Sequence, residues 1–256
     1  RPWKLSVTAI DELIRDPYAT FAHRILRLVP LDGLGGEHGP AERGQMVHAV
    51  LHRFTRDHPG PLPPDAELRL LEEARAVIAE MGVDEPTAAL WWPQMERMAR
   101  WFIDCERQWR ETARAQHAEL DGRIEFPVRG ETFVLTGRAD RIDELRDGSL
   151  RIMDYKTGAL PSFNDTKQGY SPQLLIEAHM AAQGGFAGVP AAPVSDLMYV
   201  RLSGGDPAGE RQVDQDRRGH PEVQPDPGTG RLAGLVVVGE QQQFFGERNS
   251  GHGRRR

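Results

Sequence analysis

Cysteine is almost absent from this sequence, with Cys105 the single thiol among 256 residues. One thiol excludes an internal disulfide and any zinc or iron–sulfur site built from cysteines alone. An excess of basic residues is also missing, since 32 lysines and arginines stand against 38 aspartates and glutamates, for a formal net charge of −6. This balance argues against a protein that holds nucleic acid by bulk positive charge, although it leaves room for local contacts with DNA.

Long apolar runs are missing as well. No stretch of the sequence is long enough to span a bilayer, and no charged-then-apolar leader opens it, so we expect a cytoplasmic protein. The first residue is Arg1 rather than methionine, and we take the chain to be a fragment of a longer protein. Its length fits one sizeable domain or two small ones with a real core.

The composition changes near residue 210. Residues 1–210 carry the apolar patterns of helices and strands, whereas residues 211–256 are rich in arginine, glycine, glutamine, aspartate and proline. We therefore expect one domain over 1–210, followed by a low-complexity tail over 211–256 that is either disordered or translated out of frame.

Capping residues and apolar periodicity predict a helical N-terminal part. Thr8 and Asp16 are the expected N-caps of two short helices, and Pro17 fits the first position of the second. The tryptophans and methionines after residue 90 recur at helical spacing, which favours core packing over stacking on DNA bases. Further helices are predicted over residues 40–58, 65–82 and 86–119.

Strand patterns follow these helices. The turn Asp147–Gly148 lies between two strand segments, over 137–143 and 150–156, and is a strong hairpin signal. This hairpin is the stretch around which we expect the fold to be organised. Other strands are predicted over residues 122–128, 132–138 and 194–202.

The hairpin gathers charged side chains on an apolar face. Because side chains alternate along a strand, Asp154 and Lys156 share a face with Leu150 and Ile152, and the hairpin sets Asp140 opposite Asp154 or one residue off. Burying bare charges there costs several kcal/mol per ion unless something compensates. A divalent cation bound by the two carboxylates, with Lys156 meeting an anion on that metal, is one solution. The alternative is an Asp–Lys ion pair at a strand end, with Asp140 solvated.

Asp140, followed by Asp154-x-Lys156, resembles the core of the PD-(D/E)XK nuclease superfamily in its RecB-like branch. That branch carries Gly-x-x-x-His on an upstream helix, matched by residues 44–48, and a glutamine opening a downstream helix, matched by Gln173. The blocks occur here in the family's order. The resemblance implies an α/β, restriction-endonuclease-like core, with a mixed central sheet flanked by helices and a helical N-terminal part.

The resemblance further implies a DNA nuclease that hydrolyses phosphodiester bonds with Mg²⁺ or Mn²⁺. In such a site His48, Asp140 and Asp154 would hold one or two ions, together with the main-chain carbonyl of Tyr155. Taken alone, His48 would be an ordinary helix histidine. Its place four residues after Gly44 is what assigns it to the site.

Lys156 would orient or deprotonate the attacking water, and Gln173, in the first turn of a helix capped by Ser171, would position water or phosphate. In this branch a tyrosine often follows the glutamine by four residues. Glu177 stands at that position here, so Gln173 alone carries over. An acidic residue on an earlier strand sometimes lies near the metals of family members, which makes Glu125 a candidate for an indirect role.

Many members of this family close the domain with an iron–sulfur cluster held by four cysteines. Asp16 stands here where a cysteine before proline would be expected, so we expect no iron–sulfur cluster. Residues 5–10 and 199–205 resemble, more narrowly, the C-terminal nuclease region of the AddB family of bacterial helicase–nuclease proteins, which act on double-strand breaks. This implies DNA as substrate and an AddA-like helicase–nuclease protein as partner.

Three other hypotheses remain open at this point. The chain could belong to a RecB-like exonuclease that acts alone or in another complex. It could be a non-catalytic module of the same fold that binds DNA ends. It could also carry the charged residues as a structural ion-pair cluster of unrelated function.

Overall fold

The computed structural model describes residues 3–28 and 39–213. Within them a mixed sheet of six strands is flanked by helices, so the predicted α/β class is confirmed. None of the described helices is long and apolar enough to cross a membrane. The elements in chain order are β1 (Lys4–Ser6), α1 (Val7–Arg15), α2 (Pro17–Arg24), α3 (Pro40–Asp57), α4 (Ala66–Glu80), α5 (Glu85–Thr112), β2 (Ala113–Val128), β3 (Glu131–Leu145), β4 (Leu150–Lys156), α6 (Phe163–Lys167), α7 (Gln173–Ala182), β5 (Val194–Arg201) and β6 (Glu210–Val213).

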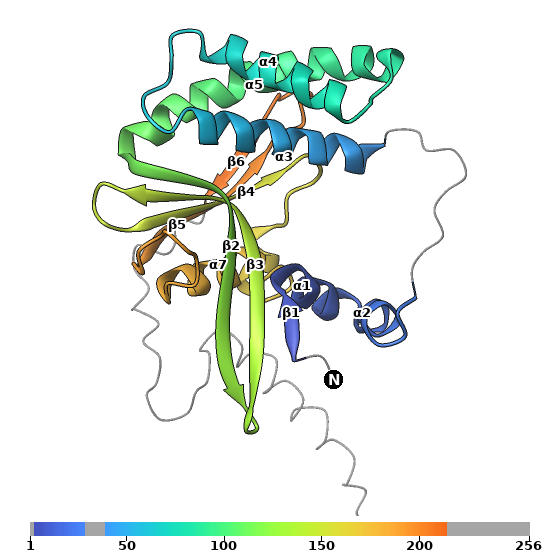
Figure 1. The fold of residues 1–256 in the computed structure, drawn as a ribbon, viewed down its shortest axis with the longest axis vertical. Helices are drawn as coiled ribbons and strands as arrows, with labels where there is room; N and C mark the ends of the chain where they lie inside the picture. The colour runs from blue at the N-terminus through green and yellow to red at the C-terminus, as the bar shows by residue number, and fades with distance from the viewer. Residues whose placement is uncertain (1–2, 29–38, 214–256) are drawn as a thin grey trace, which may run out of the picture. The chain divides into compact units, whose positions relative to one another are not determined.

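Strand β3 is the centre of the sheet. β2 pairs antiparallel with it along almost its whole length and forms the long hairpin of Figure 1. On the other edge of β3, β1 lies parallel beside residues 134–136 and β4 lies antiparallel beside residues 141–144. No described strand pairs with residues 137–140 on that edge. The sheet continues from β4 through a parallel β5 to an antiparallel β6.

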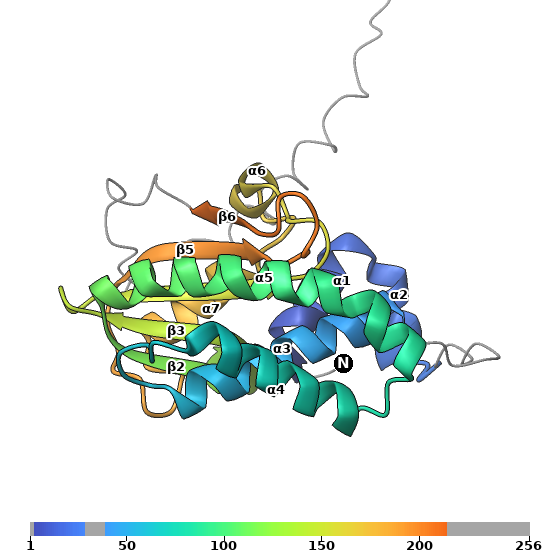
Figure 2. The same cartoon turned by 90° about the horizontal axis from the view of Figure 1, so that it is seen from above.

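Helices cover both faces of this sheet. α3, α4 and α5 lie on one face, whereas α1 and α7 lie on the other (Figures 1 and 2). Successive side chains of β4 point to opposite faces, so Met153 and Tyr155 join the core under α3–α5, and Ile152 joins the core under α7. Asp154 therefore follows Ile152 toward the α7 side.

The helix starts agree only in part with the expected caps. Ser6 rather than Thr8 caps α1, since its hydroxyl accepts a backbone N–H of the first turn at 3.1 Å. Asp16 caps α2 as predicted. Ser171 does not cap α7, because its hydroxyl accepts a hydrogen bond from Arg15 at 2.7 Å.

The strands are longer than predicted. α5 ends at Thr112 rather than near residue 119, because the chain from residue 113 onward pairs with β3. The strand expected over 132–138 continues without interruption into the hairpin, as β3. The Asp147–Gly148 turn is confirmed, with Gly148 at a positive φ of 87° that glycine adopts readily. β6 carries the sheet to Val213, past the expected boundary at 210, and the rest of the predicted tail lies outside the described residues.

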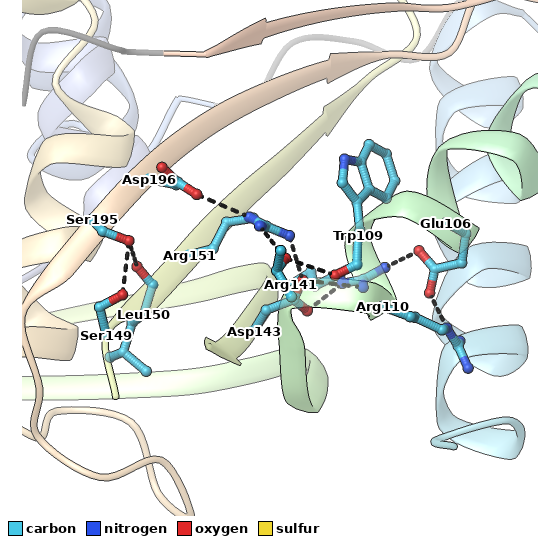
Figure 3. A network of polar contacts seen from close by, with 11 residues as sticks. Glu106, Trp109, Arg110, Arg141, Asp143, Ser149, Leu150, Arg151, Ser195 and Asp196 are labelled. Carbon is cyan, nitrogen blue, oxygen red and sulfur yellow. Dashed lines mark hydrogen bonds and ion pairs between the residues drawn. The ribbon is translucent and has the colours of Figure 1, made fainter. Parts of the chain in front are cut away.

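A buried ionic network joins α5 to the hairpin (Figure 3). Arg141 is wholly buried and donates to Glu106 at 2.5 Å and to Asp143 at 2.6 Å. Arg110 donates to the other oxygen of Glu106 at 2.6 Å, and Arg151 lies 3.4 Å from Asp143. Each buried charge thus faces an opposite one, which is the condition for tolerating charge in a protein interior.

Replacing Arg141 by methionine leaves two acidic groups buried without their shared cation. Breaking a buried ion pair costs roughly 3–5 kcal/mol, so we expect Arg141→Met to lower the free energy of unfolding in urea by about that amount. The control is Arg138→Met on the same strand. Its guanidinium is mostly exposed, where an ion pair contributes at most about 1 kcal/mol. Equal losses in the two variants would contradict the role given to the network.

Candidate active site

Asp140 and Asp154 meet where β3 and β4 stop pairing. The last ladder pair joins Arg141 to Met153, and continuing this register by one residue sets the two aspartates opposite each other, as the sequence predicts. Asp140 accepts a hydrogen bond from the main-chain N–H of Tyr155 at 2.7 Å. Asp154 is almost wholly buried. The hairpin therefore presents two carboxylates at the open end of its ladder.

His48 reaches this point from α3. Its Nδ1 lies 3.3 Å from the Oδ1 atom of Asp140. One turn earlier, a side-chain carbon added to Gly44 would lie 3.3 Å from the hydroxyl of Thr157, so glycine lets α3 approach the end of β4 closely. Burial lowers the pKa of His48, but the hydrogen bond and charge of Asp140 outweigh it, and the pKa is raised above its ordinary value.

Lys156 and Gln173 surround the carboxylate of Asp154. The ammonium of Lys156 lies 2.9 and 2.7 Å from the two oxygens of Asp154. Gln173, the first residue of α7, donates its amide to Asp154 Oδ1 at 2.7 Å and accepts from Lys156 at 3.4 Å. Burial lowers the pKa of Lys156, whereas Asp154 raises it, and the net shift is upward. The lysine is therefore a charged donor at neutral pH.

The carboxyl of Asp154 is strongly perturbed. Burial raises its pKa to about 6, although Lys156 opposes the shift. A carboxyl that titrates this close to neutrality, inside a cluster of polar groups from several elements, is typical of a functional position rather than of a surface ion pair.

Glu177 was missed by the sequence reasoning, yet it adjoins the polar cluster formed by His48, Asp140, Asp154, Lys156 and Gln173. It is almost wholly buried and accepts a hydrogen bond from the amide of Gln173 at 3.2 Å. Its other oxygen, Oε2, has no hydrogen-bond partner among the described residues. Burial and the charge of Asp154 raise its pKa well above the usual range. The signal in the sequence was its position four residues after Gln173, on the same face of α7.

The model of the PD-(D/E)XK nuclease superfamily matches residues 4–234. The chain belongs to this superfamily. The expected superfamily is thus confirmed, and the match runs past residue 210.

Three relatives illustrate the similarity. An uncharacterized protein of Rickettsia bellii is 29% identical over 182 residues, which cover 71% of this chain and 22% of that protein. An uncharacterized protein of Rickettsia felis is 30% identical over 192 residues, covering 72% and 22%. One of the subunits of an ATP-dependent helicase/deoxyribonuclease of Streptococcus pyogenes serotype M1 is 27% identical over 207 residues, covering 78% and 18%. The chain spans about a fifth of the length of these relatives.

Glu125 lies away from the polar cluster of this superfamily member. Its side chain is half exposed and forms an ion pair with Arg123 on the same strand. Glu125 also pairs with Val134 of β3, six residues before Asp140, a distance of about 20 Å along a strand. The structure therefore gives no support to an indirect role for Glu125 at the site.

The donor atoms around Asp140 and Asp154 suit a hard divalent cation, since they are carboxylate oxygens and an imidazole nitrogen. The Oδ2 atom of Asp154 is buried and lacks an aligned hydrogen-bond donor, with the ammonium of Lys156 beside it. Within residues 3–28 and 39–213, no three histidine, cysteine or acidic side chains stand close enough together to hold an ion. The chemistry of the donors thus fits a metal, while the side chains as placed do not converge on one point.

The pKa of Asp154 can be checked directly. In the metal-free protein we expect its side-chain carboxyl to titrate near pH 6 in ¹³C NMR, because burial disfavours its charged form. Lys156→Met removes the charge that opposes this shift, so the pKa should rise further. The exposed Asp147 of the hairpin turn, whose pKa is lowered by Ser149, is the internal control and should not move. Titration of Asp154 near pH 4 would contradict this account.

Proposed function

We propose that this chain is a metal-dependent DNA nuclease domain that hydrolyses phosphodiester bonds. The observation that carries the proposal is the convergence of His48 from α3, Asp140 from β3, Asp154 and Lys156 from β4, and Gln173 from α7. Four elements that are distant in sequence supply these groups. An isolated ion pair at a strand end would require neither the imidazole nor the amide.

His48, Asp140 and Asp154, with the main-chain carbonyl of Tyr155, are the groups that would hold Mg²⁺ or Mn²⁺. When bound, such an ion lowers the pKa of its water and offsets negative charge at the reacting phosphate. The protein's own part is to present two carboxylates at the end of one ladder, held by the N–H of Tyr155 and by the side chains around Asp154.

Lys156 and Gln173 have positioning roles in this mechanism. Because the pKa of Lys156 is raised, its ammonium donates hydrogen bonds rather than accepting a proton, so it orients the water or the phosphate and does not act as a base. Gln173 stands at the N-terminus of α7, where unpaired N–H groups favour an anion. Its amide holds Asp154 in place while its carbonyl faces Lys156.

We further propose that the domain belongs to an AddB-like protein that acts as an exonuclease in double-strand break repair, with an AddA-like helicase–nuclease protein as its partner. The similarity to the helicase/deoxyribonuclease of Streptococcus pyogenes supports this assignment. Because that similarity covers 18% of the relative, the unwinding activity and the partner are proposals about a longer protein.

A second candidate is a DNA-end-binding module without catalysis. It is favoured by one observation, that no three potential metal ligands converge among the described residues. Such a module would bind DNA equally well with and without a divalent cation, whereas a nuclease would cleave the DNA when Mg²⁺ is added.

Cleavage of a labelled oligonucleotide by the purified chain tests the nuclease proposal. We expect Mg²⁺-dependent cleavage, and a loss of about 10²- to 10⁴-fold in rate for Asp154→Asn and for Lys156→Met, because each removes a charge at the reacting phosphate. Asp147→Asn, in the exposed turn of the same hairpin, is the matched control and should cleave like the wild type. Undiminished cleavage by either site variant would overturn the assignment, and DNA binding without any cleavage would favour the end-binding module.

A further inference from the structure

A cavity of about 500 Å³ opens between the start of α1, the middle of the β2–β3 hairpin and α7. Its walls are side chains of β1 and α1, residues 121–123 and 136–138 of the hairpin, and Glu177. This volume is typical of sites that hold small molecules or single nucleotides. Neither the family resemblance nor the polar cluster accounts for it.

The cavity follows from the way β1 and β4 divide the edge of β3. β1 ends at Ser6, where the chain turns into α1, and the β4 ladder begins only at Arg141. The intervening residues 137–140 have no strand partner on that edge within the described part of the chain. The cavity therefore opens beside the same gap that holds Asp140.

Glu177 forms a wall shared by the cavity and the polar cluster. One of its oxygens accepts from Gln173, which in turn donates to Asp154, and the residue also lines the cavity. Its Oε2 atom is buried with no hydrogen-bond partner among the described residues. An unsatisfied buried oxygen is costly, and a ligand in the cavity would supply the missing partner.

The rim of the cavity favours an anionic ligand. α1 has nine residues and begins at the cavity with Val7 and Thr8, so the positive end of its dipole faces the space. Lys4, Arg123 and Arg138 also line it. Because burial raises the pKa of Glu177 well above its usual range, this side chain is a neutral acid that can donate a hydrogen bond to an anion instead of repelling it.

We propose that this cavity binds one nucleotide of the DNA strand adjoining the bond to be cleaved, with its phosphate near the start of α1 and its inner end against Glu177. The proposal rests on the nuclease function and names a substrate-binding site for it. Through the contact between Glu177 and Gln173, an occupied cavity is linked to the group that holds Asp154.

Filling the cavity tests the proposal. Thr136 lines it from β3, whereas Thr132 lies on the same strand, is exposed, and does not line it. Binding of a fluorescent single-stranded oligonucleotide of about ten nucleotides is measured by anisotropy with the full chain in EDTA, so that no cleavage occurs. We expect Thr136→Trp to raise Kd by about tenfold or more, the loss of one well-made contact to a charged group, and Thr132→Trp to bind like the wild type.

A charge variant provides a test that does not depend on how a tryptophan packs. Lys4 is on the rim, and Lys4→Glu should weaken binding and reduce the slope of log K against log salt by about one, as loss of one phosphate contact does. Arg107→Glu makes the same charge reversal on an exposed position of α5, on the opposite face of the sheet. It should leave the salt slope unchanged.

Failure of this proposal can be told apart from failure of the nuclease function. If the wild type cleaves DNA and both Thr136→Trp and Lys4→Glu bind like their controls, the cavity is not a nucleotide site and the nuclease function stands. If the wild type binds without cleaving, and the two cavity variants alone bind more weakly, the cavity site stands and the nuclease function falls. If the wild type does not bind the oligonucleotide, the cavity proposal is overturned.

Discussion

The division of one strand edge is the constraint on which the rest of this structure depends. A β-strand edge must pair its N–H and C=O groups or leave them to other partners. β1 and β4 each pair with a part of β3, and the unpaired stretch between them ends at Asp140. Side chains from α3 and α7 reach the carboxylates only at this interruption, so the polar cluster lies where the ladder stops.

Alternation along the hairpin strands then separates two charged assemblies that are close in sequence but lie on opposite faces of the sheet. Arg141 and its acidic partners are closed off under α5, where every charge has a counterpart (Figure 3). Asp154 and Lys156 face α7, where an oxygen of Asp154 and one of Glu177 lack aligned donors. The first assembly holds the hairpin against the helices, and the second keeps coordination capacity in reserve, as functional sites commonly do.

Local patterns were sufficient to predict the hairpin, the cap at Asp16 and the α/β class, because each depends on residues close together in sequence. The place of His48 followed only from the resemblance, since periodicity alone cannot say which helix face meets a distant strand. The lengths of β2 and β3 were underestimated because pairing between the two strands, rather than propensity, determines where they end. Glu177 was set aside as a mismatch to a tyrosine, and its role is visible only once α7 is packed beside β4.

The bare position at Gly44 limits how this protein can diverge. Any larger residue brings its first side-chain carbon to 3.3 Å from the Thr157 hydroxyl, tighter than ordinary van der Waals contact. The separation between α3 and the end of β4 is thus set by an atom that the residue lacks. Mutational drift along the outer surface of α3 is free, whereas on this one turn it is confined to whatever preserves the thinness of the helix.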